Sequence, residues 1–244
     1  MSMRRVLMLA VVAAGSTGLH AFTPTSVLAA APEPDPVPRR WQLDFEPGPL
    51  RITSVEVPGA GPRAYFYFTY RVTNNTGREQ LLAPLFDLAS SEGDLRRAGR
   101  DVPLFVMQKI QGMLDNPLLE DQVEILGPIQ RGPENARDGL VVWPVDDLKI
   151  DELVIYAGGF SGESATVEVP VPAEEVDAAR ARTEQGEDMD LVARGSDFRQ
   201  LEDGSWVKRV VLRKTMMIRY DVPGDLNIGR VAPLEEGERR WIMR

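Results

Sequence analysis

The sequence contains no cysteine, and its one histidine, His20, lies near the N-terminus. Without thiols the chain can form no disulfide, and without imidazole or thiolate we expect no zinc or copper site. If His20 is removed with a leader, a Ser-His-Asp triad and a cysteine nucleophile paired with histidine are excluded too. We therefore expect no cofactor, and carboxylate chemistry is the main route left to an enzyme.

Basic residues are also fewer than acidic ones. The chain has 28 Lys and Arg against 37 Asp and Glu, a formal net charge of −9. Loss of residues 1–29 would remove two arginines and no acid, which changes this charge to −11. An acidic surface disfavours nonspecific binding to nucleic acid, so we predict no nucleic-acid partner.

The N-terminus has the order of segments typical of a secretory signal peptide. Arg4 and Arg5 precede the apolar run Val6–Ala14, and small residues follow up to Ala29. That run is too short to span a bilayer. We predict a signal peptide at 1–29, export to the periplasm or the exterior, and no stable membrane span after cleavage. An uncleaved anchor and a twin-arginine signal are the alternatives.

The strongest strand signal is Ala64–Val72. Alternation places Phe66, Phe68 and Tyr70 on one face, opposite Tyr65 and Tyr67. Too little of the chain has helical periodicity to cover the first face, so a second sheet is the expected cover. Further short strands are separated by Gly, Pro and Asp turns. We predict a mainly β, Ig-like or fibronectin-type antiparallel sandwich with one short amphipathic helix and a C-terminal β-hairpin.

Composition divides the rest of the chain into segments. We expect a Pro/Ala-rich linker at 30–40, a β-sandwich domain at 41–172, an acidic helical or linker segment at 173–195, a hairpin at 196–230 and a tail at 231–244. The hairpin turns at Asp203-Gly204. The tail is polar except for Trp241-Ile242-Met243, which can dock onto the body. Whether the hairpin joins the main sheets stays open.

Three local elements are predicted more closely. Asp101–Asn116 is expected to be an amphipathic helix over an end of the sandwich, capped by Asp101, with groove binding as the alternative. Its apolar stripe is Leu104, Met107, Ile110 and Met113 or Leu114. Gln80–Leu88 is expected to pair antiparallel with the central strand. Asn74-Asn75-Thr76 is expected to form a turn, with glycosylation of Asn74 as the alternative.

The long strand that begins at Trp206 carries the candidate binding residues. Between Trp206 and Arg219 it has five basic residues and no acid: Lys208, Arg209, Arg213, Lys214 and Arg219. They could form a docking stripe for an anionic polysaccharide, a phosphate or an acidic envelope protein. The alternative is the solvent face of a strand, or ion pairs with the protein's own acids.

Three groups of acids could serve a carboxylate-dependent hydrolase. They are Glu120 with Asp121, Asp146 with Asp147 and Asp151, and Glu187 with Asp188 and Asp190. Acids are frequent in this chain, so solvated surface pairs explain them better. The second group could hold Ca²⁺ but lacks the spacing of a calcium loop. We predict no catalytic and no metal-binding residues.

Several strings carry a resemblance. They are Trp41 with Asp44-Phe45-Glu46-Pro47-Gly48-Pro49, Tyr67–Val72, Leu119–Gln122, Gly139–Val141 with Trp143-Pro144, and Arg240–Arg244. Over Trp41–Arg244 the chain resembles a family of uncharacterised exported bacterial proteins. The resemblance implies an exported domain with an Ig-like β-sandwich. No activity is known for that family, so the resemblance identifies no functional residues in this chain.

The expected function is that of an exported, non-enzymatic β-sandwich protein, a binding or structural module of the cell envelope. Its partner would be an envelope protein or an anionic polysaccharide. The main alternative is a carboxylate-dependent glycan hydrolase. A periplasmic scaffold without a ligand is the third possibility.

Overall fold

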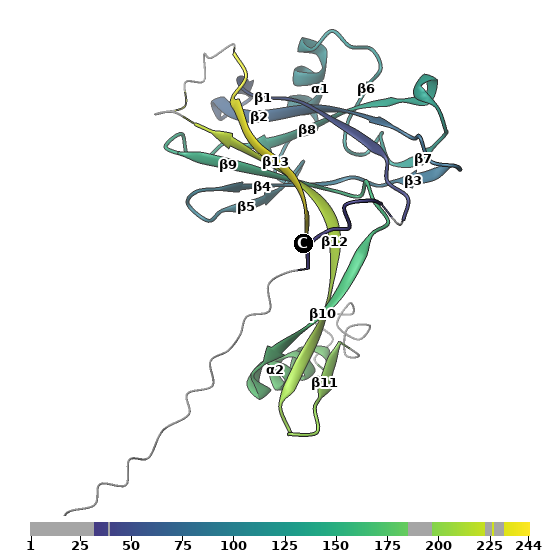
Figure 1. Ribbon diagram of the computed structural model, residues 1–244. Coiled ribbons are helices and arrows are strands. Elements are labelled where there is room, and N and C mark those ends of the chain that lie inside the picture. The colour runs from purple at the N-terminus through teal and green to yellow at the C-terminus, as the bar shows by residue number, and fades with distance from the viewer. Residues whose placement is uncertain (1–31, 39, 185–196, 223–225, 227–231) are drawn as a thin grey trace, which may run out of the picture. The chain divides into compact units, whose positions relative to one another are not determined.

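A computed structural model describes residues 32–38, 40–184, 197–222, 226 and 232–244 (Figure 1). The predicted signal peptide at 1–29 and the acids Glu187, Asp188 and Asp190 lie outside these residues. Within the described ranges, neither helix combines the length and the apolar composition that a membrane crossing requires.

The first sheet has four strands in the order β1-β2-β8-β6. Their bounds are β1 Asp44–Val57, β2 Gly61–Thr73, β8 Arg137–Pro144 and β6 Leu119–Glu120. β2 contains the predicted central strand and runs antiparallel to both neighbours, so that Phe66 lies opposite Ile52 on one side and Trp143 on the other. A separate two-stranded sheet pairs β3 Gln80–Leu82 with β7 Gly127–Ile129.

The second sheet has the order β10-β12-β9-β4-β5, with β11 and β13 also paired to β12. Its strands are β4 Leu85–Ser90, β5 Leu95–Arg97, β9 Glu152–Gly158, β10 Ser164–Val171, β11 Phe198–Gln200, β12 Trp206–Asp221 and β13 Glu235–Met243. The first half of β12 pairs with β10 and β11, which confirms the predicted hairpin. Its second half lies between β9 and β13. The long hairpin strand therefore belongs to the main sheet.

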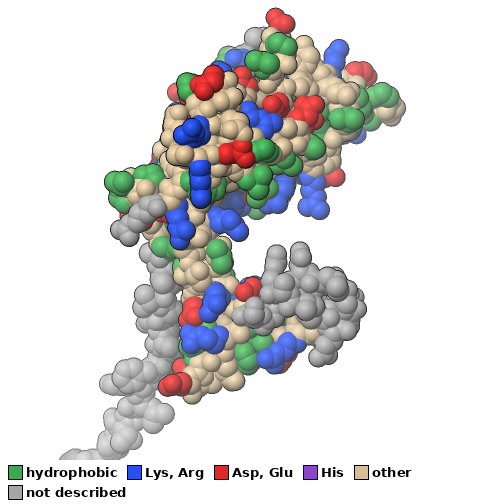
Figure 2. All heavy atoms as spheres, turned by 90° about the vertical axis from the view of Figure 1, so that its right-hand side faces the viewer, with side chains coloured by type: hydrophobic (Ala, Val, Ile, Leu, Met, Phe, Trp, Pro, Cys, Tyr) green, Lys and Arg blue, Asp and Glu red, His purple; other side chains and the backbone are tan. Residues whose placement is uncertain are grey.

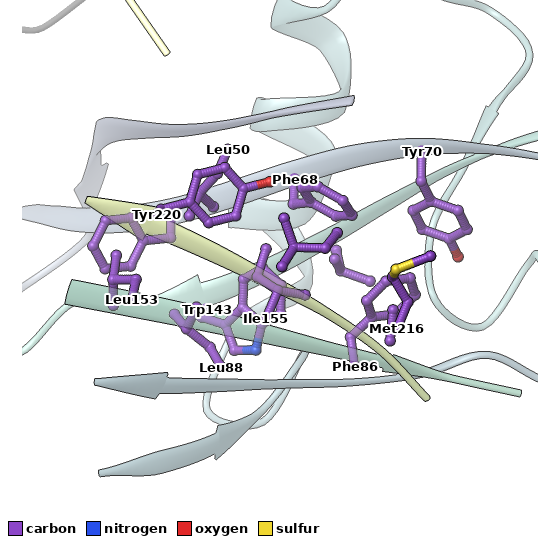
Figure 3. Close-up of a cluster of buried hydrophobic side chains, with 14 of the residues drawn as sticks. Leu50, Phe68, Tyr70, Phe86, Leu88, Trp143, Leu153, Ile155, Met216 and Tyr220 are labelled. Atoms are coloured by element: carbon purple, nitrogen blue, oxygen red, sulfur yellow. The ribbon is translucent and has the colours of Figure 1, made fainter. Parts of the chain in front are cut away.

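The two sheets enclose one apolar core. Phe68 and Tyr70 from β2 meet Phe86 from β4, Ile155 from β9 and Tyr220 from β12 (Figure 3). The rings of Tyr70 and Phe86 have centroids 4.7 Å apart. Burying one such side chain stabilises a fold by about 1.5–3 kcal/mol. The predicted mainly β, antiparallel sandwich is confirmed.

The helix α1, Leu104–Met113, is where we predicted it along the chain but not in space. It covers the outer face of the first sheet rather than an end of the sandwich, since Met107 and Ile110 pack against Tyr65 and Tyr67. The strand β2 is therefore buried on both faces. The second helix, α2 Ala173–Glu184, lies within the predicted acidic segment.

The predicted cap and part of the predicted stripe of α1 are wrong. Asp101 has a φ of +61°, and the N-cap is Pro103 without a side-chain hydrogen bond. Leu104 and Met113 are exposed, whereas Leu114, the predicted alternative to Met113, packs against the same cluster as Met107 and Ile110. Val106, which was not in the predicted stripe, is buried. Helical periodicity alone does not fix which side of α1 is buried. The position of the first sheet decides it.

Two further expectations need correction. Gln80–Leu88 does not pair with the central strand, because β8 occupies the place beside β2. The segment divides into β3 and β4 at Pro84, which has no N–H to donate to a neighbouring strand.

Residues 231–244 contain strand β13, where a polar tail was expected. Its side chains are mostly exposed because it lies beside β12 at an edge of the sheet, so its polar composition does not prevent pairing.

The turn after β2 is explained by Asn74. This side chain is fully buried, and its Nδ2 donates to the carbonyls of Arg78 at 3.0 Å and Ile129 at 2.8 Å. Its Oδ1 accepts from the backbone N–H of Thr76 at 3.0 Å. The predicted turn is confirmed, and a side chain held in this way is not available for glycosylation.

Candidate functional site

The five basic residues of β12 do not form one stripe. Lys214 is only 3% exposed, and its Nζ lies 2.8 Å from Glu163. Lys208 pairs with Glu175 at 3.5 Å and Arg219 with Glu152 at 3.4 Å. The other two, Arg209 and Arg213, are exposed and form no ion pair with the described residues. Successive side chains of a strand point to opposite faces, so the run is divided between them.

Arg213 is the member that the fold brings close to other arginines. Its backbone N–H donates to the carbonyl of Arg244 at 2.7 Å, and the N–H of Arg244 donates back at 3.1 Å. Residues that exchange both bonds in an antiparallel pair lie directly opposite, about 5.5 Å apart at Cα, with side chains on the same face. Like charges in this position repel each other.

Arg244 also reaches across the outer face of the sheet to β4 and β9. Its Nη1 donates to Asp87 Oδ2 at 2.8 Å, and its guanidinium carbon lies 4.3 Å from the ring centroid of Tyr156. Arg97 Nε donates to Asp87 Oδ1 at 3.1 Å. Burial would raise the pKa of Asp87, but the hydrogen bonds and charges of Arg244 and Arg97 outweigh it and lower this pKa. One carboxylate therefore holds two guanidinium groups.

A third arginine shares this region. Arg97, Arg100 and Arg244 line one hollow of about 690 Å³, together with Asp87 and Gln122. Gly99 has a φ of +72°, and a Cβ there would lie 1.6 Å from Gln122 Nε2, so glycine at this position lets the amide lie against the backbone. We name Arg97, Arg100, Arg213 and Arg244 the arginine cluster.

The arginine cluster is positive in a chain whose formal net charge is −9. Figure 1 places β4, β5 and β12 at the lower side of the sandwich, and Figure 2 shows Lys and Arg side chains gathered along that side. Guanidinium groups stay charged at any physiological pH and present forked donors that match carboxylate and phosphate. The arrangement can therefore bind an anion.

Sequence reasoning found Arg213 and missed the other three members. Arg97 and Arg100 lie in a short Arg-rich string before α1, and Arg244 lies in the terminal string Arg240–Arg244. Both strings are visible in the sequence. What brings them together is the pairing of β4, β5 and β13 within one sheet, which local periodicity does not predict.

Three of the predicted acids have structural partners, and the third group, Glu187, Asp188 and Asp190, lies outside the described residues. Glu120 pairs with Arg137, and Asp121 Oδ1 accepts the N–H groups of Val123 and Glu124 at 2.7 and 2.9 Å. In the second group, Asp146 pairs with Arg96. Across the described ranges, no group of three or more His, Cys, Asp or Glu side chains could hold a metal ion.

Comparisons with known proteins add no family to this site. No family model matches the chain, and neither a curated protein nor a solved structure matches it.

Proposed function

We propose that this protein is an exported, non-enzymatic module of the cell envelope that binds an anionic polysaccharide through the arginine cluster. The observation that carries the proposal is the pair Arg213 and Arg244, two arginines placed directly opposite each other on one sheet face. Their mutual repulsion falls when an anion binds between them. Export is proposed from the signal-peptide pattern and from the resemblance to exported bacterial proteins.

A polysaccharide that carries carboxylates suits the chemistry of the hollow. The guanidinium groups of Arg97, Arg100 and Arg244 can each take a carboxylate or hydroxyl oxygen, and the Gln122 amide can pair with a neutral hydroxyl. Asp87 occupies part of the donor capacity of Arg97 and Arg244 and keeps both side chains in place. These two side chains are therefore ordered before a ligand arrives, which lowers the entropy lost on binding.

Three of the acids proposed for a glycan hydrolase are already engaged within the described residues. A glycosidase needs two carboxylates on opposite sides of the scissile bond, one of them held protonated. Glu120 and Asp146 are each engaged by an arginine, and Asp121 holds a turn. These three acids are therefore poorly placed to act as the catalytic pair.

The test is binding of polygalacturonate to the purified protein, measured by calorimetry at low salt, with dextran as the neutral control. We expect polygalacturonate alone to bind. We expect Arg213→Gln and Arg244→Gln each to weaken binding by about three- to tenfold, because a charge-assisted contact is lost. The matched control is Arg63→Gln, an exposed arginine of β2 outside the cluster, which should bind normally.

Equal binding by all three variants would contradict the proposal, and so would equal binding of dextran. Binding of poly-glutamate with no binding of polygalacturonate would assign the cluster to an acidic protein partner instead. Added salt should weaken the interaction, since exposed charges are screened over about 8 Å at 0.15 M. Affinity that does not change with salt would also contradict an anion site.

A further inference from the structure

A cavity of about 180 Å³ lies at one end of the sandwich, where the β4–β5 turn meets the loop from β8 to β9. Its walls include Phe66, Leu88, Val145, Ile150 and Leu153. These apolar side chains come from both sheets, so the cavity is an extension of the core. Apolar cavities of about 150 Å³ are large enough to bind benzene. The apolar part of an occupant can therefore have the size of one aromatic ring.

The rim of the same cavity is acidic. Four carboxylates line it, from Glu92, Asp94, Asp146 and Asp147, against one guanidinium from Arg96. Arg96 already pairs with Asp146. Glu92 and Asp94 form no ion pair with the described residues, and the rim therefore keeps a surplus of negative charge. A cation at the mouth of this cavity is attracted, and an anion is repelled.

Ser90 also lines this cavity, but its hydroxyl oxygen is not accessible from it. Ser90 Oγ is shielded from solvent and has no hydrogen-bond partner among the described residues. The same holds for Nε1 of the fully buried Trp143, whose cross-strand neighbour Phe66 lines the cavity. Figure 3 shows Trp143 in the same part of the core as Leu88 and Leu153. Buried polar groups are usually satisfied, so two unpaired atoms show that the core is imperfectly packed at this end of the sandwich.

We infer that this cavity binds a small organic cation with an apolar body, of the arylalkylammonium class. The apolar walls receive the ring, and Glu92 and Asp94 at the rim attract the positive charge. A metal ion does not suit the site, because its walls are apolar and no group of three or more ligating side chains is present among the described residues. This site has its own lining residues and does not depend on the arginine cluster.

Binding of benzylammonium to the purified full chain, followed by calorimetry, tests the inference. Benzyl alcohol and benzoate are probes of similar shape with neutral and negative charge. We expect benzylammonium to bind at least threefold more tightly than benzyl alcohol, and benzoate to bind most weakly. Equal affinity for the three probes, or no binding of benzylammonium at millimolar concentration, would overturn the proposal.

Variants of the rim give the second test. Glu92→Gln and Asp94→Asn lie in an exposed turn, and each should weaken benzylammonium by about two- to fivefold, as expected for an exposed charge contact. Arg96→Gln should tighten it by a similar factor, because the internal cation that competes for Asp146 is lost. Glu56→Gln on β1 is the matched control. The proposal fails if Arg96→Gln weakens binding or if Glu56→Gln changes it as much as Glu92→Gln does.

Discussion

Arg213 and Arg244 exchange two backbone hydrogen bonds, of 2.7 and 3.1 Å, so their guanidinium groups leave the same face of the second sheet. Like charges directly opposite each other on a sheet face repel. Arg244 pairs with the carboxylate of Asp87, whereas Arg213 has no ion pair among the described residues. We therefore expect the two side chains to contribute to stability with opposite signs.

The first prediction is that Arg213→Gln stabilises the protein at low salt and Arg244→Gln destabilises it. Removing Arg213 relieves repulsion worth about 0.2–1 kcal/mol for a cross-strand pair. Removing Arg244 takes a partner from Asp87 and a stacking contact from Tyr156. Urea unfolding at two salt concentrations measures both effects. The gain from Arg213→Gln should shrink as salt is added, and a gain independent of salt would show that repulsion is not its cause.

Asp87 should contribute to acid sensitivity. Burial raises its pKa, but Arg244 and Arg97 lower it further than burial raises it, so the folded-state pKa lies below the unfolded value near 3.8. Between these two pKa values the unfolded chain binds more protons, so stability falls as pH falls. The contribution of Asp87 is complete above the unfolded pKa and is lost as pH drops through the folded one. Asp87→Asn should therefore lose less stability between pH 5 and pH 2 than the unmodified protein, measured by urea unfolding. An identical pH dependence for the two proteins would contradict this.

Lys214 and Glu163 form a buried ion pair at the junction of β9, β10 and β12. Lys214 Nζ also donates to the carbonyl of Asp35 at 3.3 Å, and Glu163 Oε1 accepts the N–H of Asp35 at 2.7 Å. Lys214→Met should destabilise the protein by about 3–5 kcal/mol, because Glu163 would keep a buried charge after losing its ion pair with Lys214.

The double variant Lys214→Met with Glu163→Leu removes both charges and should lose much less stability than the sum of the two single changes. A double-mutant cycle from urea unfolding measures this coupling. Additive losses would show that the two residues act independently, contrary to the geometry.

Gly139 should tolerate no side chain. A Cβ at this position would lie 2.2 Å from Cζ of Tyr70, which is buried between the sheets. Gly139→Ala should therefore cost about 1–3 kcal/mol of unfolding free energy through overpacking, measured by urea unfolding. Gly77→Ala is the control, since a Cβ there has no atom within 4 Å and should change stability little.

Much of the fold follows from local patterns. Alternation in Ala64–Val72 predicts a strand with an aromatic inner face, and the Asp203-Gly204 turn predicts the hairpin of β11 and β12. The position of α1 along the chain, though not its place on the sheet, follows from helical spacing. These features depend on residues close together in the chain, which share one backbone conformation. What local patterns could not predict was the pairing of Gln80–Leu88 and of Glu235–Met243, because either segment could lie beside several strands.

The candidate site, like the fold, could be predicted only in part from the sequence. The basic run of β12 was visible in the sequence, but its side chains point to opposite faces of the strand. One of them, Lys214, is only 3% exposed and pairs with Glu163. The cluster instead unites Arg97, Arg213 and Arg244, which are far apart in the sequence.

The sequence by itself determined the β class of this chain, its acidic charge and the absence of thiols, because composition and alternation are properties of the residues alone. Only the tertiary structure decided which arginines share a face and which acids surround a cavity. The physical reason is that strand pairing joins distant segments through backbone hydrogen bonds, and these bonds do not depend on side-chain charge.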